Sequence, residues 1–153
     1  MQQVAIWTPD KDLAQCVVAD RVVQVDRRSG KVRNADGVRE KFRVIPARIP
    51  DYLALVGDSA DGYPGLPGIG AKTAARLIER HGAIEAFPDD ALRDQRDAAV
   101  LFKKLATLRT DAALFDDVDA LRWSGPTPAF DELMDEMGGQ RLRERVAKLA
   151  RVD

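Results

Sequence analysis

Several features that would narrow the class of this protein are scarce or absent from its sequence. One cysteine, Cys16, occurs among 153 residues. A disulfide framework is therefore excluded, and the apolar neighbours of Cys16 predict a buried, unreactive thiol. Basic and acidic residues number 24 and 25 and leave a net charge of -1, so any nucleic-acid-binding surface must be local. Because long apolar runs and a signal-peptide pattern are absent, we expect a cytoplasmic protein without a membrane partner.

Internal repeats, heptads and low-complexity segments are also absent, and the length suits one domain. The N-terminal part combines short apolar and β-branched runs with turn residues. Residues 2–7 predict a buried strand, and residues 20–26 and 31–34 predict two further strands joined by a turn. Between the first two, residues 8–18 predict a helix that Thr8 or Asp10 could cap. This part therefore predicts a small αβ unit.

The remainder of the chain has helical periodicity almost throughout. Helices are expected over residues 34–42, 49–57, 69–82, 97–111 and, as two helices broken at Gly138–Gly139, 130–150. The fourth carries an apolar pattern at Val100, Leu101, Leu105 and Leu108. The predicted fold is α+β but mainly α, with an αβ part over residues 1–48 and a helical part over residues 49–153 in one compact unit.

The strand predicted at residues 2–7 lacks enough neighbours. A strand buried on both faces is normally flanked on both sides, and residues 20–26 supply only one flanking strand. The sheet would then lack a strand on one side of residues 2–7. Either another chain or further sequence supplies the rest, or the strand prediction is wrong.

The glycine-rich segment GLPGIGAKT (65–73) nearly matches a nucleotide-binding phosphate loop. Ala71 separates Gly70 from Lys72, and one extra helical residue rotates the lysine by about 100° away from the phosphates. Pro64 and Pro67 also remove backbone N–H donors from a loop that needs them. We therefore reject the nucleotide-loop interpretation.

The same segment, extended to LPGIGAKTAARLI, resembles a helix–hairpin–helix, which grips the DNA backbone without reading sequence. Glycines let the backbone approach a phosphate, and the free N–H groups of a first helical turn point toward it. Such contacts position duplex DNA and carry no sequence information. The alternative is a plain glycine-rich corner between helices. The candidate DNA-binding residues are Gly68, Ile69, Gly70, Ala71, Lys72, Thr73 and Arg76.

Four aspartates form a candidate metal site. Asp58 and Asp61 directly precede the hairpin, and Asp10 and Asp12 follow the first strand, where α/β proteins place their chemistry. Converging carboxylates repel one another unless they share divalent cations such as Mg²⁺ or Mn²⁺. The alternative is that Asp10 caps a helix and the other aspartates are turn residues. The spacing excludes an EF-hand.

Two stretches, TPDKDLAQ (8–15) and DYLALVGDSADGYPGLPGIGAKTAARLIERHG (51–82), resemble the 5′→3′ exonuclease and flap endonuclease family in motif and in spacing. That family includes the 5′-nuclease domain of bacterial DNA polymerase I. The resemblance implies that residues 1–48 are part of a PIN-like nuclease core. It also implies that residues 49–153 are a SAM-like helical region containing a helix–three-turn–helix.

The resemblance further implies roles for individual residues. Asp10 would belong to one divalent-metal site, and Asp12, Asp58 and Asp61 would form a second. The hairpin would hold double-stranded or flapped DNA, and a K⁺ ion would bind backbone carbonyls such as those of Leu66 and Ile69. The implied reaction is metal-dependent phosphodiester hydrolysis in DNA replication and repair.

Three departures from the family pattern bear on activity. Pro9 replaces a glycine, Gly62 replaces an asparagine, and the family's N-terminal half, with its own acidic residues and helical arch, does not precede Met1. We expect this chain to hold only part of the catalytic site. The alternatives are a non-catalytic helix–hairpin–helix DNA-binding module derived from the family and a helical partner-binding domain.

Overall fold

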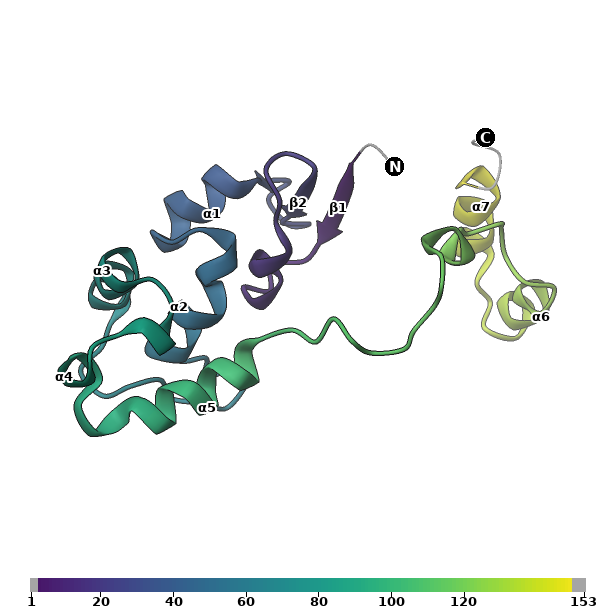
Figure 1. Cartoon of the computed structure of the whole chain (residues 1–153). Coiled ribbons are helices and arrows are strands. Elements are labelled where there is room, and N and C mark those ends of the chain that lie inside the picture. The colour runs from purple at the N-terminus through teal and green to yellow at the C-terminus, as the bar shows by residue number, and fades with distance from the viewer. Residues whose placement is uncertain (1–2, 150–153) are drawn as a thin grey trace. The chain divides into compact units, whose positions relative to one another are not determined.

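A computed structural model describes residues 3–149 of the chain, and Figure 1 shows its elements. The chain separates into two compact units, Met1–Thr110 and Asp111–Asp153. The division predicted between residues 48 and 49 stays a prediction. The α+β class with predominant helix is confirmed, because a small three-stranded sheet accompanies helices that make up most of the ordered chain.

The sheet has the order β1 (Val4–Trp7), β2 (Val22–Val25) and β3 (Val32–Arg33). β1 pairs with β2 in parallel, and β2 pairs with β3 in antiparallel fashion across the predicted turn. Within the described residues the other edge of β1 is unpaired. The predicted first strand is confirmed over Val4–Trp7, but the prediction that it is buried is wrong, because Ala5 and Trp7 are exposed and Val4 and Ile6 are half-buried. Gln2 lies outside the described residues.

The helix predicted over residues 8–18 is wrong in type and length. The structure has a 3₁₀ helix at Asp12–Cys16, after which the backbone turns extended at Val17. Asp10 accepts a hydrogen bond from the N–H of Asp12 at 3.0 Å, and Thr8 accepts one from Asp10 at 3.2 Å. These short-range bonds close a turn without starting an α-helix, and Val18 already bridges to Val22. Cys16 is half-buried, and burial raises the pKa of its thiol.

Three other helices of the first unit, α1, α2 and α3, follow the prediction closely because their ends carry local signals. The helix predicted over residues 97–111 ends already at Ala106, and a short helix at Asp89–Leu92 was not predicted. The side chain of Asn34 caps α1 by accepting a hydrogen bond from the N–H of Gly37. Glycines end α2 and α3, at Gly57 and Gly82. The α-helices of this unit are α1 (Ala35–Phe42), α2 (Ile49–Val56), α3 (Ala71–His81), α4 (Asp89–Leu92) and α5 (Arg96–Ala106). Shorter 3₁₀ turns occur at Pro46–Arg48, Ile84–Ala86 and Arg93–Gln95.

Helix α2 lies at the centre of this unit and packs against α3 and α5 (Figure 1). Nearly every residue of α2 is buried, including Ile49, Leu53 and Leu55. Helix α5 meets it through small residues, since Ala99 and Ala106 are buried. The apolar residues Val100, Leu101 and Leu105 of α5 are exposed instead. Periodicity identified this helix correctly, but its apolar pattern does not mark the face that α2 covers.

The second unit contains a 3₁₀ turn (Val118–Leu121) and the helices α6 (Ala129–Glu136) and α7 (Gln140–Leu149). The predicted break at Gly138–Gly139 is confirmed. Gly138 has a φ of +63°, in the left-handed region that glycine tolerates. Arg143 of α7 binds Asp131 and Asp135 of α6 at 2.8 Å each, which ties the two helices together. None of the described helices is both long and apolar enough to cross a membrane.

Candidate functional site

Three of the four predicted aspartates come together. Asp12, in the 3₁₀ helix after β1, and Asp58 and Asp61, after α2, each offer a carboxylate oxygen, and these oxygens lie within 4.8 Å of one another. Two oxygens on opposite sides of a bound Mg²⁺ are about 4.2 Å apart. A small movement of the carboxylates toward one another, or a water between a carboxylate and the ion, would therefore complete the coordination. One oxygen of Asp12, Oδ1, is buried and has no hydrogen-bond partner among the described residues. An all-carboxylate donor set with an unused buried oxygen fits a hard divalent cation.

A tight turn holds Asp58 in place. The backbone of Asp58 exchanges two hydrogen bonds with Tyr63, at 2.9 and 3.1 Å, and its side chain accepts one from Ala60 at 3.0 Å. The ends of the turn cross at Gly57 and Gly65. A Cβ on either glycine would lie 2.4 Å from backbone atoms of the other strand of the turn. Only glycines at both positions allow this crossing, which brings the carboxylates and the hairpin into one continuous loop.

The electrostatics of the group are uneven. Burial, the hydrogen bond with Asp61 and the surrounding carboxylates raise the pKa of Asp12 to about 6. Burial also acts to raise the pKa of Asp58, but its hydrogen bonds to Lys11 and to the Ala60 N–H outweigh burial, and the net pKa is lowered. Lys11 Nζ lies 2.8 Å from Asp58 Oδ2. A buried carboxylate needs a positive partner, and Lys11 supplies it here.

Asp10 does not join the group of three. Its side chain is exposed and accepts the hydrogen bond from the Asp12 N–H, although its charge helps to raise the pKa of Asp12. The fully buried Gln24 of β2 donates a hydrogen bond to the Asp10 carbonyl, and Arg33 of β3 donates one to Gln24 at 3.1 Å. The sheet thus fixes the backbone that carries Asp10 and Asp12. The assignment of Asp10 to a separate metal site stays a prediction.

The predicted hairpin follows directly. Leu66 is buried and its N–H donates to the Leu55 carbonyl at 2.9 Å, which anchors the loop to α2. The Ile69 N–H donates to the Leu66 carbonyl at 3.1 Å, and helix α3 begins after Gly70. Gly68 has a φ of +80°, whereas Gly70 has an ordinary extended backbone, and a Cβ at either position would meet no atom within 4 Å. Packing therefore does not explain Gly70.

The first turn of α3 presents the remaining hairpin residues. Ala71, Lys72 and Arg76 are exposed, and Thr73 is half-buried, while Ala74, Ala75 and Ile78 face the core. No side chain caps the N-terminus of α3. The helix thus begins with uncapped backbone N–H groups next to exposed basic side chains and an open glycine. The roles of these residues stay predictions.

Lys103 of α5 is held in ion pairs with two acidic residues. It binds the buried Asp51 at 2.8 Å and Glu85 at 2.7 Å. The Ile84 N–H donates to the same Asp51 carboxylate at 2.9 Å. The hydrogen bonds with Asp51 and Glu85 raise the pKa of Lys103 against the effect of burial, which is the largest single influence. This network joins α2, α5 and the Ile84–Ala86 turn, so its role is structural.

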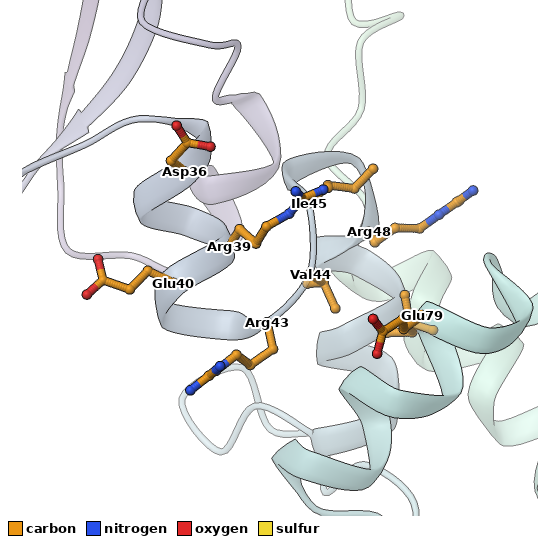
Figure 2. Close-up of a pocket in the computed structure, with 9 residues that line it drawn as sticks. Asp36, Arg39, Glu40, Arg43, Val44, Ile45, Arg48 and Glu79 are labelled. Carbon is orange, nitrogen blue, oxygen red and sulfur yellow. The ribbon is translucent and has the colours of Figure 1, made fainter.

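A groove of about 790 Å³ lies between α1, the segment after it and α3. Charged residues of both signs line it, and Figure 2 shows Asp36, Glu40 and Arg43 pointing in different directions rather than toward a common centre. A ligand site needs polar groups that converge. This groove therefore does not compete with the carboxylate group as the candidate site.

Sequence patterns missed three residues around the carboxylates, namely Lys11, Gln24 and Tyr63. Lys11 lies within the DKD motif and is easily counted as a solvent-exposed charge. Gln24 stands inside a strand otherwise composed of valines, and this polar position was the one available signal. Tyr63 lies in the turn, is 4% exposed, and its hydroxyl is buried without a partner among the described residues.

Comparison with known proteins places the chain in a family. The family described as "5'-3' exonuclease, C-terminal SAM fold" matches residues 44–129, which is more than half of the chain. The chain belongs to this family. The resemblance to the 5′→3′ exonuclease and flap endonuclease family is thereby confirmed.

The similar sequences are longer than this chain. The 5′-3′ exonuclease of Aquifex aeolicus (strain VF5) is 38% identical over 116 residues, a match that covers 71% of this chain and 40% of that protein. DNA polymerase I of Pseudomonas aeruginosa is 37% identical over 136 residues, covering 77% of this chain and 15% of the polymerase. The matched region is thus less than half of the length of either relative.

Solved structures show the same fold. The T5 5′-exonuclease with bound zinc ions matches 69% of this chain and 43% of its own, with a TM-score of 0.62 and 19% identity. A T5 flap endonuclease, in a pseudo-enzyme–product complex with DNA and metal ions, matches equally with a TM-score of 0.62 and 18% identity. At this identity the likeness establishes the fold.

Proposed function

We propose that this chain is part of a divalent-metal-dependent 5′-3′ exonuclease or flap endonuclease that binds the backbone of duplex DNA. The observation that carries the proposal is the adjacency of two features in one loop. The carboxylates of Asp58 and Asp61, with that of Asp12, stand at one end of the loop, and the open start of α3 stands at the other. A duplex held at the hairpin would present a phosphate near the carboxylates.

The proposed cations are Mg²⁺ or Mn²⁺, held by Asp12, Asp58 and Asp61, with Asp10 contributing to a second site. Such ions supply an activated water and stabilise the departing oxygen when bound. The protein's own part is to fix the carboxylates through the Asp58–Tyr63 turn and through Gln24. Lys11 neutralises Asp58 in the metal-free chain.

The proposed DNA contact is the segment Gly68–Thr73 with Arg76. N–H groups at the start of α3 would donate hydrogen bonds to a phosphate, and Lys72 and Arg76 would add positive charge. A K⁺ ion at the carbonyls of Leu66 and Ile69 is part of the same proposal. The Leu66 carbonyl accepts one hydrogen bond from Ile69 and retains a second lone pair for an ion.

Whole-protein activity forms a further part of the proposal. Since the relatives are longer, we propose that a nuclease half of the kind they contain completes the site, in the same protein or in another chain. Cleavage of flapped duplexes in DNA replication or repair, and a cytoplasmic location beside that substrate, follow from this assignment. The second candidate is a binding module without catalysis, and the observation that favours it is the Lys11–Asp58 pair, in which a lysine occupies one carboxylate of the group.

Duplex binding tests the proposal. Fluorescence anisotropy at fixed low salt would compare the wild type with Lys72→Ala, and with Lys31→Ala as an equally exposed control in the β2–β3 turn. We expect Lys72→Ala to weaken binding severalfold for every DNA sequence and to lower the salt dependence, with little change for Lys31→Ala. Equal binding by all three proteins would contradict the assignment of the hairpin as the DNA-binding segment.

Cleavage separates the two candidate functions. A 5′-flap duplex incubated with Mg²⁺ and the chain, with a chelator control, measures activity directly. We expect little cleavage by this chain alone and chelator-sensitive cleavage once an N-terminal nuclease half is added. DNA binding without cleavage under either condition would favour the binding module.

A further inference from the structure

The Tyr63 hydroxyl is a polar group that the fold buries without using. Tyr63 is 4% exposed, and its hydroxyl makes no hydrogen bond with any residue in the described part of the chain. Its ring stacks on Phe102 of α5, with centroids 5.6 Å apart and planes at 25°. Its backbone forms both hydrogen bonds of the turn with Asp58. The side chain is therefore held firmly, and its hydroxyl position follows from that packing.

The turn holds Tyr63 beside the carboxylate group, because its backbone pairs with that of Asp58, whose carboxylate lies within 4.8 Å of those of Asp12 and Asp61. Burial raises the pKa of Tyr63 most, and the charges of Asp12, Asp58, Asp61 and Asp10 raise it further, Asp12 foremost among them. The group remains a neutral phenol that can donate one hydrogen bond. Oδ1 of Asp12 is a second buried atom without a partner. The carboxylate group and the turn that carries it thus contain one buried donor and one buried acceptor that are both unused.

Packing alone does not account for the hydroxyl. A phenylalanine would stack on Phe102 equally well and would not bury an unpartnered polar group, which is unfavourable in a protein interior. The other tyrosine of the chain, Tyr52, is also buried but differs in its surroundings. Its ring meets Phe42 edge-on, and no carboxylate contributes to the raised pKa that burial gives it. Of the two tyrosine hydroxyls, only that of Tyr63 is a buried atom without a partner among the described residues.

We propose that Tyr63 is a positioning residue of the metal site, which donates a hydrogen bond to Asp12 when a divalent cation is bound. This inference rests on the proposed metal-dependent function and adds a residue to it. The bond would orient Asp12 as a ligand in the way that outer hydrogen bonds commonly orient ligating side chains.

Calorimetric titration with Mn²⁺ tests the inference on the wild type, Tyr63→Phe and the matched control Tyr52→Phe. We expect Tyr63→Phe to bind Mn²⁺ about tenfold more weakly and Tyr52→Phe to bind like the wild type. We also expect the Tm of metal-free Tyr63→Phe to be unchanged or raised, because an unpartnered buried hydroxyl is removed. Equal Mn²⁺ affinity of Tyr63→Phe and wild type, or a lowered metal-free Tm, overturns the inference.

A second measurement observes the hydroxyl directly. The chain has two tyrosines, so Tyr52→Phe leaves Tyr63 alone, and its ultraviolet resonance Raman doublet reports hydrogen bonding. We expect the doublet to change to that of a donor on Mg²⁺ addition, and an unchanged doublet in protein that binds Mg²⁺ contradicts the inference. Failure of the wild type to bind either metal overturns the proposed metal function and the inference together. Metal binding with no Tyr63 effect overturns the inference alone.

Discussion

Two pairs of glycines in one loop differ in the space around them. Gly57 and Gly65 cross at such short range that a Cβ on either would lie 2.4 Å from backbone atoms. Gly68 and Gly70, a few residues later, face open space, where a Cβ would meet nothing within 4 Å. The first pair is explained by packing and fixes the carboxylates. The second pair is free of packing constraints, as expected of a surface reserved for a partner.

The largest effect is expected at the crossing. Gly65→Ala should lower the free energy of unfolding by about 4 kcal/mol or more, because the new Cβ overlaps backbone and the φ of +74° is unfavourable for alanine. Urea denaturation measures this. Gly68→Ala is the control, since its φ of +80° carries the same strain without a clash, and should cost about 1 kcal/mol. Equal losses in the two variants would show that the close approach is unimportant.

Substitution of a glycine that faces open space should affect duplex binding rather than folding. Gly70→Val adds a branched side chain in front of α3, where the backbone φ of -91° accepts it and nothing stands within 4 Å. We expect the unfolding free energy to change by less than about 0.5 kcal/mol. Duplex affinity should fall about tenfold, because the side chain keeps a phosphate from the N–H groups. Anisotropy at low salt measures it, and unchanged affinity would show that this surface does not bind DNA.

The smallest expected effect is the pH dependence of stability that Asp12 causes. The pKa of Asp12 is raised from 3.8 to about 6, so its proton stabilises the metal-free fold fully below pH 4. That contribution is lost as the pH rises through about 6. Relative to Asp12→Asn, the wild type should lose about 1 kcal/mol between pH 4 and 7, a value reduced for partial exposure. Urea titrations with a chelator present measure the difference, and a constant difference would contradict the raised pKa.

Local signals made most of the first unit predictable. Asn34, Gly57 and Gly82 delimit helices where the sequence suggested them, since caps and glycine ends act within a few residues. Position in the sequence predicted a group of four aspartates that included Asp10, whereas the grouping of Asp12 with Asp58 and Asp61 was implied by the family resemblance. Periodicity correctly located α5.

Contacts between distant residues were not predictable. The Lys11–Asp58 and Lys103–Asp51 pairs join separate elements, and no spacing rule connects their members. The covered face of α5 depended on the close approach of Ala99 and Ala106 to α2 rather than on its larger apolar residues. Such features arise from packing between elements, which periodicity within one element does not determine.

Metal titration with matched double variants tests the central claim most directly. Calorimetry with Mn²⁺ would compare the wild type, Asp58→Asn with Asp61→Asn, and Asp94→Asn with Asp97→Asn. The second pair has the same spacing and is exposed on the surface before and within α5. We predict Mn²⁺ binding by the wild type and the control and its loss in the first double variant. Binding that survives in Asp58→Asn with Asp61→Asn, or is lost equally in both double variants, would contradict the account.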